Sequence, residues 1–242
     1  MIDFDRRRVL AMLAASSAGG LVPGAASAAR SPVPSIYAAL PGEPHPVPAM
    51  APGTVPSRFW RTTVPLDTAE RPGTVIVDPR SKHLYLIQPG GSAIRYGIGA
   101  GRAGFEWSGR AVVGRKKAWP VWTPPADMIA REPWLAPYRN GFPAGPENPL
   151  GARAFYLHRN GRDTLYRIHG THQPWSIGKA ISSGCIRMLN HDVIDLSARV
   201  PIGAPVVVMA WKEPQRVQPR RVRRAVRTPR GASRDAARNG LY

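Results

Sequence analysis

The sequence predicts a single, mainly β domain with one or two short helices, flanked by disordered tails. Short runs rich in β-branched and aromatic residues, bounded by Gly, Pro and Asn, fill about residues 60–211. Only one stretch in that range has both the spacing and the end signals of a helix. The 242 residues suit one compact domain with tails, or two small domains at most, and a hydrophobic content of 43% is enough for a core.

The expected strands follow one another along this range. Residues 74–91, TVIVDPRSKHLYLIQPGG, hold two β-rich runs around Asp78–Ser81 and therefore predict a hairpin. Residues 93–101, AIRYGIGAG, predict a short strand and a glycine-rich turn. Further strands are expected at residues 118–125, 152–160, 164–171 and 204–211, the last of them buried.

The clearest helix is expected at residues 190–203, NHDVIDLSARVPIG. Asn190 or Asp192 is suited to cap its first turn, because a short polar side chain can accept a hydrogen bond from an unpaired backbone N–H there. Pro201 with Gly203 ends the helix. Its apolar face consists of Val193, Ile194 and Leu196.

The first 28 residues have the layout of an export signal. A basic region at residues 6–8 precedes a mildly apolar run at residues 9–22, and an A-x-A cleavage site follows at residues 26–28. The arginine pair resembles a twin-arginine signal, and an ordinary secretory signal is the alternative. We therefore expect cleavage near Ala28 and a periplasmic protein.

Two tails flank the predicted domain. Residues 29–59 carry a proline every few positions, which predicts an extended, semi-rigid linker. Residues 212–242 hold ten basic residues against Glu213 and Asp235, which predicts a disordered basic arm. The whole chain has a net charge of +19, so we expect an anionic partner such as the cell wall or a membrane surface. The export signal argues against nucleic acid.

Cys185 is the only cysteine, and its residue type alone fits either a buried hydrophobe or a nucleophile. In an exported chain a lone thiol cannot form an internal disulfide, which suggests a reactive thiol or an intermolecular bridge. A nucleophilic cysteine needs a base within reach and donors for the oxyanion that forms next. His169, beside Gly170 at a predicted strand end, is suited to be the base, and Gly184 leaves room for backbone N–H donors.

The stretch around Cys185 resembles the active-site signature of the L,D-transpeptidase catalytic domain family, the cysteine enzymes of bacterial peptidoglycan. That signature is a His-Gly pair, a gap, and then Ser-His-Gly-Cys-x-Arg with an Asn shortly after. The chain matches it with His169-Gly170, Ser182 to Cys185, Arg187 and Asn190. Two upstream segments, VIVDPRSKHLYLI and GPENPLGARAFYL, are also similar to family segments, so the likeness covers roughly residues 73–209.

The resemblance implies a catalytic domain of the β-sandwich type over residues 60–211, without a cofactor or metal, and a two-step acyl transfer. Cys185 is expected to attack the carbonyl of the third residue of a tetrapeptide stem while His169 takes the thiol proton, and D-alanine leaves. An amine of a second peptidoglycan stem, or of an envelope protein, then resolves the thioester. With water as acceptor the enzyme is instead an L,D-carboxypeptidase. By the same resemblance, carbapenems should acylate Cys185.

The resemblance also implies roles for neighbouring residues. The backbone N–H groups of Gly184 and Cys185 are candidates to face the oxyanion. Arg187 either grips a stem carboxylate with two parallel hydrogen bonds or forms a structural salt bridge. The chain departs from the family at Ser183, where histidine is most frequent, so the role of base falls to His169, and rate or substrate preference can differ. The other candidate substrate-binding residues are Ser182, Ser183, Gly170, His172 and Asn190.

Two other functions are compatible with parts of the sequence. A zinc peptidase would use His158, His169 and His172, but the chain has no glutamate at a familiar spacing such as H-E-x-x-H. A non-catalytic wall-binding module would explain the charge and the tails. Several aromatic residues line either a cleft or the core, namely Trp107, Trp119, Trp122 and Trp134, and His83 and His158 are expected on strand faces or the surface.

Overall fold

A computed structural model describes residues 32–101, 107–182 and 185–210, with only the backbone described at residues 181 and 182. The predicted signal peptide and the predicted basic tail lie outside the described residues. The strands are β1 (Thr62–Pro65), β2 (Val75–Asp78), β3 (His83–Gln88), β4 (Ser92–Gly101), β5 (Gly109–Ala118), β6 (Arg153–Arg159), β7 (Arg162–His169), β8 (Ala180–Ser182), β9 (Ile186–Met188) and β10 (Pro205–Val208). The helices are α1 (Ala126–Arg131) and α2 (Asn190–Arg199), with 3-10 turns at Ser35–Tyr37, Ser57–Phe59, Pro133–Tyr138 and Pro174–Ser176.

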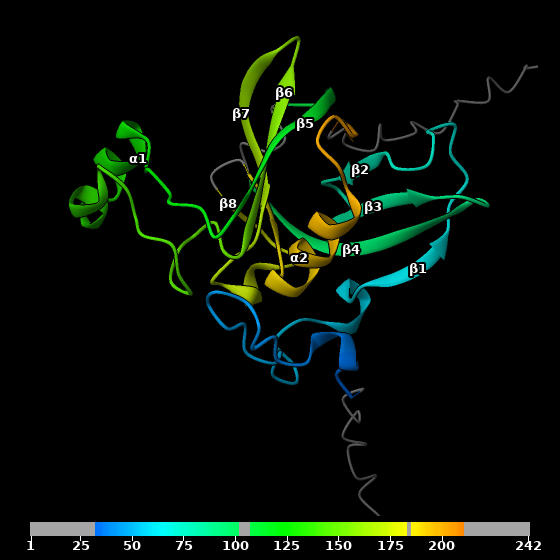
Figure 1. The fold of residues 1–242 in the computed structure, drawn as a ribbon, viewed down its shortest axis with the longest axis horizontal. Coiled ribbons are helices and arrows are strands. Elements are labelled where there is room, and N and C mark those ends of the chain that lie inside the picture. The colour runs from blue at the N-terminus through cyan, green and yellow to red at the C-terminus, as the bar shows by residue number, and fades with distance from the viewer. Residues whose placement is uncertain (1–31, 102–106, 183–184, 211–242) are drawn as a thin grey trace, which may run out of the picture.

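Eight of these strands close into a barrel of mixed strand direction (Figure 1). Their order is β4-β3-β2-β10-β5-β6-β7-β9, and β9 pairs back onto β4 at Ile98–Met188 and Gly99–Arg187. Within this ring β10 with β2 and β7 with β9 are parallel pairs. Strands β1 and β8 add to β4 outside the ring. The prediction of a mainly β domain with one or two short helices is confirmed, and the expected sandwich takes the form of a closed barrel.

The core lies inside the barrel and follows from the alternation of side chains along the strands. Val75 and Val77 of β2 are buried, whereas Ile76 and Asp78, which alternate with them, are only partly buried, as expected for a strand with one face in a core. The predicted hairpin between β2 and β3 is confirmed, and the Asp78 carboxylate accepts hydrogen bonds from two backbone N–H groups of its turn. Helix α2 packs on the same core through Val193 and Leu196.

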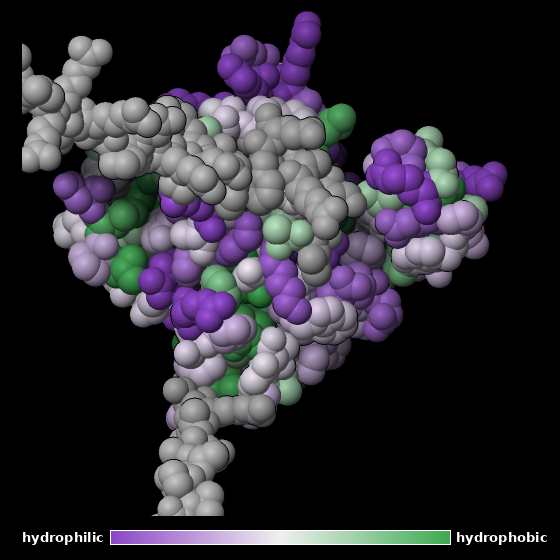
Figure 2. Space-filling view, turned by 180° about the vertical axis from the view of Figure 1, so that it is seen from behind, coloured by the Kyte–Doolittle hydropathy of each residue, from purple (hydrophilic) through white to green (hydrophobic). Residues whose placement is uncertain are grey.

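A lobe made of α1 and the 3-10 turn at Pro133–Tyr138 stands away from the barrel (Figure 1). Figure 2 shows the same lobe from behind, set off from the body of the domain. None of the helices in the described part of the chain is long and apolar enough to cross a membrane.

The prediction of a strand at residues 118–125 is wrong. Strand β5 occupies Gly109–Ala118 and ends where Trp119 takes a φ of +41° and Pro120 lacks the N–H that a ladder needs. Beyond it only Trp122 keeps a single bridge, to Phe142. Strand β5 itself was not predicted, because its many basic residues hide the alternation and the strand bulges between Val113 and Arg115.

The prediction that Asn190 or Asp192 caps α2 is also wrong. The helix spans Asn190–Arg199 with Leu189 at its N-cap, and no side chain there bonds to the first turn. The Asn190 side-chain oxygen instead accepts a hydrogen bond from the backbone N–H of Ala152, at 3.0 Å. The Asp192 side chain is completely buried, so the core rather than a cap determines its position.

The proline-rich segment before residue 60 is not a spacer: its described part, from residue 32, packs against the barrel. Between its prolines it places Tyr37, Val55 and Phe59 in a second apolar cluster with Ile177 and Leu189. Prolines start or flank its short turns, so they direct the chain without preventing apolar residues from packing. The folded unit therefore begins upstream of the predicted domain boundary.

Two glycines leave room for this segment to pack closely against the domain. A Cβ atom on Gly97 would lie 2.5 Å from the Cβ of Phe59, and one on Gly178 would lie 2.2 Å from the Phe59 ring. Only glycine therefore allows the segment to approach β4 and the loop after the turn at Pro174–Ser176 so closely.

A polar network joins the segment to α2. The Tyr37 hydroxyl donates to a carboxylate oxygen of Asp192 at 3.3 Å and accepts from the backbone N–H of Arg61 at 2.5 Å. The Arg61 guanidinium lies 2.9 Å from the Asp195 carboxylate, which also accepts from the Tyr96 hydroxyl at 2.7 Å. Burial raises the pKa of Asp192 to about 7, although Arg61 at 3.9 Å opposes the rise.

Replacement of Asp192 by asparagine should flatten the dependence of stability on pH. In the native wild-type protein Asp192 keeps its proton up to about pH 7, whereas an unfolded aspartate loses it near pH 4. Between these values the native state binds more protons, so this group lowers the free energy of unfolding by on the order of 1 kcal/mol per unit of rising pH. Asparagine keeps an acceptor for Tyr37 and removes the titration.

Urea unfolding at pH 4.5 and pH 7.5 measures this effect as the difference between wild type and variant. Asp127→Asn, at an exposed carboxylate of α1, is the control and should follow the wild type. If the free energy of unfolding changed with pH equally in the wild type and in Asp192→Asn, Asp192 would be ionised in the native state throughout this range.

Candidate functional site

The parallel pairing of β7 with β9 brings the two predicted chemical groups to one face of the barrel. Ile168 lies opposite Ile186, and His169 lies opposite Arg187. The two isoleucines are buried in the core, so the residues that alternate with them face outward. Cys185 directly precedes Ile186 and shares the face of Arg187, next to the C-terminal end of β7.

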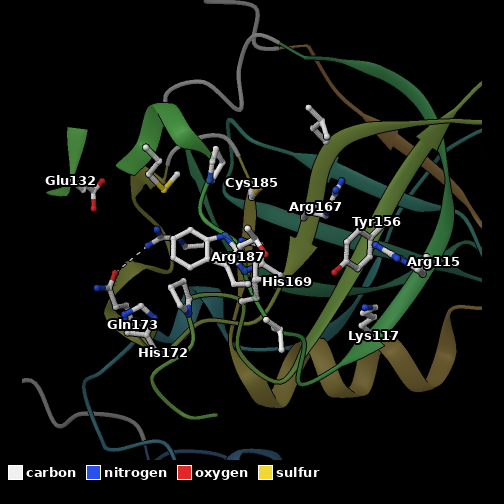
Figure 3. A pocket seen from close by; sticks show the side chains of 18 of the residues that line it. Arg115, Lys117, Glu132, Tyr156, Arg167, His169, His172, Gln173, Cys185 and Arg187 are labelled. Atoms are coloured by element: carbon white, nitrogen blue, oxygen red, sulfur yellow. Dashed lines mark hydrogen bonds between the residues drawn. The ribbon is translucent and has the colours of Figure 1, made fainter. Parts of the chain in front are cut away.

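This face forms the wall of a pocket of about 710 Å³. Figure 3 shows Cys185, His169 and Arg187 at its centre, with His172 and Gln173 on one side and Tyr156 and Arg115 on the other. The projecting lobe supplies the opposite wall through Met128, Glu132 and Trp134.

His169 is buried and held in one tautomer by its own loop. Its Nδ1 lies 2.6 Å from the carbonyl oxygen of Gly170. A carbonyl can only accept, so Nδ1 carries the proton of the neutral ring and Nε2 is left as an acceptor. Burial, together with the nearby positive charges of Arg187 and Arg167, lowers the pKa of His169 to about 4. The ring is therefore neutral at physiological pH and able to take a proton.

Cys185 is half-buried and not part of a disulfide. Burial raises the pKa of its thiol above the ordinary value, while a backbone hydrogen bond from Arg167 and the charges of Arg167 and Arg187 act in the opposite direction. The resting thiol is therefore protonated at neutral pH. A protonated thiol attacks a carbonyl only as a base removes its proton. A neutral histidine can act as that base.

The loop that follows His169 is fixed from behind by Asn190. A Cβ atom on Gly170 would lie 2.2 Å from the Asn190 side-chain oxygen, and one on Gly151 would lie 2.3 Å from it. The Gly170 N–H donates to the carbonyl of Arg153 at 3.0 Å, which ties the loop to the start of β6. Glycine at both positions lets α2 approach the loop and hold the His169 ring in place.

The family model of the YkuD type, described as the L,D-transpeptidase catalytic domain, matches residues 72–208, more than half of the chain. The chain belongs to this family. The match covers β2 to β10 and includes Cys185, His169 and the pocket between them.

Relatives with curated names are similar over the same region. The Probable L,D-transpeptidase YbiS of Escherichia coli K12 is 37% identical over 138 residues, 54% of this chain and 43% of that protein. The Probable L,D-transpeptidase ErfK/SrfK of Salmonella typhimurium is 37% identical over 141 residues, 56% of this chain and 43% of that protein. The matched region thus spans less than half the length of these relatives.

Solved structures also match. A Brucella melitensis crystal structure described as a probable carnitine operon oxidoreductase caia is 44% identical and covers 64% of this chain and 97% of its own, with a TM-score of 0.46. An L,D-transpeptidase from Mycobacterium smegmatis is 19% identical, with 57% and 58% covered and a TM-score of 0.39.

The pocket gathers some of the predicted site residues and not others. His172 and Arg187 line it with Cys185 and His169, whereas Asn190 lies behind the loop. Gly170 contributes its carbonyl to His169. Ser183 and Gly184 lie outside the described residues, and Ser182 ends β8 with its side chain not described.

Arg187 is half-buried and bonded within the pocket rather than to an acid. Its guanidinium donates to the side-chain oxygen of Gln173 at 3.2 Å (Figure 3). The structural salt bridge considered for Arg187 is not found among the described residues. A neutral amide leaves the positive charge available to an anionic ligand.

Other predicted residues divide between pocket and core. Trp122 and Trp134 line the pocket, whereas Trp119 is buried against the core and Trp107 stacks on Tyr166. His158 lies over Gly114, where an added Cβ would be 2.3 Å from its ring, and it does not line the pocket. The three histidines of a zinc peptidase are therefore not brought together.

Sequence reasoning missed a row of pocket residues on the neighbouring strands. Arg115, Tyr156 and Arg167 are paired across β5, β6 and β7. Arg167 stands two residues before His169 on the same strand, so the alternation of side chains was a signal for its position. The same signal for Arg115 was hidden, because β5 was not predicted.

Proposed function

We propose that this chain is a peptidoglycan L,D-transpeptidase that acts through a thioester on Cys185. One observation carries the proposal: Cys185 and a neutral, oriented His169 line the same pocket in a chain of the L,D-transpeptidase family. A thiol, a base and a pocket open to solvent are the parts that acyl transfer requires.

In the first step the donor is the tetrapeptide stem of a peptidoglycan fragment. The Cys185 sulfur attacks the carbonyl carbon of the third residue while His169 Nε2 takes the thiol proton. The bond to D-alanine then breaks, and His169 returns the proton to the leaving amine. Backbone N–H groups of Cys185 and Gly184 are the proposed donors to the oxyanion, and Arg187 is the proposed contact for a donor carboxylate.

In the second step an amine replaces the sulfur. The amine nitrogen attacks the thioester carbonyl, the carbon–sulfur bond breaks, and the proton of the amine passes through His169 to the departing sulfur. A side-chain amine of a second stem gives a cross-link between third residues, and an amine of an envelope protein gives attachment of that protein. Water gives hydrolysis and an L,D-carboxypeptidase. Ser183 replaces the more usual histidine, and His169 carries both proton transfers.

The setting proposed for this reaction is the periplasm, after cleavage of an export signal near Ala28. The net charge of +19 supports an anionic partner, and the basic segment at residues 212–242 is the proposed contact with wall or membrane.

The test of the proposed function is incubation of the purified protein with disaccharide-tetrapeptide fragments, followed by mass spectrometry of the products. We expect released D-alanine together with a dimer joined through its third residues. Tripeptide without dimer would identify a carboxypeptidase. Intact substrate, in the presence of a correctly folded protein, would contradict the proposed function.

A further inference from the structure

Residues 32–60, called here the N-terminal segment, lie upstream of the region that the family model matches, which begins at residue 72. In Figure 1 the segment is the blue stretch below α2, packed on the body of the domain. Two of its side chains, Phe59 and Glu43, contact the parts of the chain that carry the reacting groups. A part in catalysis for this segment is therefore additional to the matched family region.

The first point of contact is the loop at residues 170–179, which connects β7 to β8 on the way from one reacting residue to the other. Phe59 is buried with Ile177 of this loop and with Leu189, which joins β9 to α2. A Cβ atom on Gly178 would overlap the Phe59 ring, so the ring lies directly against the loop backbone. Phe59 therefore supports the end of this loop from outside the pocket.

The same loop carries side chains of the pocket. His172 and Gln173 line it, and the Gln173 side-chain oxygen accepts the hydrogen bond from Arg187. The N–H of Gly178 donates to the carbonyl of Ile98 at 2.9 Å, which attaches the end of the loop to β4. Because the Phe59 ring packs at this attachment, loss of the ring would let the loop and its pocket side chains shift.

The second point of contact lies behind His169. The Glu43 carboxylate accepts hydrogen bonds from both terminal nitrogens of Arg153, at 2.8 and 2.7 Å, and from Trp119 Nε1 at 2.9 Å. The bonds from Arg153 lower the pKa of Glu43, so the carboxylate is charged at neutral pH. The carbonyl of Arg153 accepts from the Gly170 N–H, and the Gly170 carbonyl holds His169 Nδ1. Glu43 therefore fixes the residue to which the start of the loop is bonded.

We propose that Phe59 and Glu43 are positioning residues of the active site. Through them the N-terminal segment holds the loop after His169 at both its ends, and so sets the positions of His169 and of the pocket side chains relative to Cys185. Neither Phe59 nor Glu43 lines the pocket, so both act through other residues. This inference rests on the proposed function, because it assigns the segment a part in the same reaction.

Phe59→Ala tests the end of the loop in the full-length protein. The measurement is kcat and KM for D-alanine release from disaccharide-tetrapeptide, at a temperature where each variant is folded. We expect kcat to fall by about 10- to 100-fold with a smaller change in KM, because a displacement of about 1 Å far from the chemistry can cost that much. Phe59→Leu should recover most of the loss, since a branched apolar side chain still fills the site.

Leu86→Ala is the control for a loss of stability alone. It truncates a side chain of β3 that is as fully buried as Phe59 and does not line the pocket. The melting temperature should fall while kcat stays near that of the wild type.

Amide hydrogen exchange measures the loop independently of activity. In Phe59→Ala the N–H of Gly178 should exchange at least about 10-fold faster, relative to the amides of β6 in the same molecule, because its hydrogen bond to β4 opens more often. In Leu86→Ala this ratio should stay at the wild-type value.

Glu43→Gln tests the start of the loop. Glutamine keeps one acceptor but loses the charged fork to Arg153, so we expect kcat to fall by about 5- to 10-fold. Glu70→Gln is the matched control, because Glu70 accepts the same kind of fork from Arg110 outside the pocket. It should leave kcat unchanged.

Phe59→Ala with the kcat and the exchange ratio of Leu86→Ala would overturn the part assigned to Phe59. Glu43→Gln with the kcat of Glu70→Gln would overturn the part assigned to Glu43. Absence of D-alanine release from the unsubstituted protein would instead overturn the proposed function, and hydrogen exchange would still decide whether the N-terminal segment holds the loop.

Discussion

Replacement of Cys185 by alanine is expected to abolish D-alanine release from a disaccharide-tetrapeptide, with a fall of at least about 1,000-fold. The substitution removes the Cys185 thiol from the pocket and leaves the rest of the lining unchanged. The side chain is half-buried and small, so the fold should persist with a similar melting temperature. The measurement is the initial rate of D-alanine release.

The chain itself supplies a sharp control for this prediction. Cys185 is its only cysteine, so thiol alkylation of the wild type reports on this residue alone. Prior alkylation should reproduce the loss seen in the alanine variant. A Cys185→Ala protein that retained a tenth of the activity would require another nucleophile.

Replacement of His169 by glutamine should lower the rate of D-alanine release by about 100- to 10,000-fold, the usual contribution of a general base. Glutamine can still occupy the buried site beside Gly170, but it cannot take a proton from Cys185. His172→Gln is the matched control, because His172 is a second histidine that lines the same pocket. It should lose much less activity, and the reverse order of the two losses would assign the base to His172.

The pH profile of the wild type adds a second signature of His169. Because its pKa is lowered to about 4, the ring gains a proton and ceases to be a base only as the pH falls through about 4. Activity should therefore persist at pH 5.5, where an ordinary histidine with a pKa near 6.5 would be largely protonated. An acid limb centred near pH 6.5 would mean that a different group, or an exposed ring, acts as the base.

The sequence predicted the features that depend on neighbours along the chain. The hairpin at residues 74–91 follows from alternating apolar residues around a turn, and α2 follows from the spacing of Val193 and Leu196 with Pro201 beyond its end. The meeting of His169 and Cys185 was predicted from the motif, and the parallel pairing of β7 with β9 accounts for it.

The features that the sequence did not predict depend on contacts distant in the chain. The proline-rich segment packs because Gly97 and Gly178, far from it in sequence, leave room for Phe59. Asn190 looked like a helix cap, yet its oxygen bonds to the start of β6. Arg115 was not singled out from the sequence, because only its pairing with Tyr156 across β5 and β6 places it in the pocket. No local pattern contains this information.

The most direct measurement of the central claim is the mass of the intact protein shortly after mixing with disaccharide-tetrapeptide, beside Cys185→Ala. We predict an adduct equal to the donor minus D-alanine, mapped to Cys185 by peptide analysis, absent from the variant and released by an added amine. D-alanine release without such an adduct, or an adduct of the same mass on the alanine variant, would contradict the account.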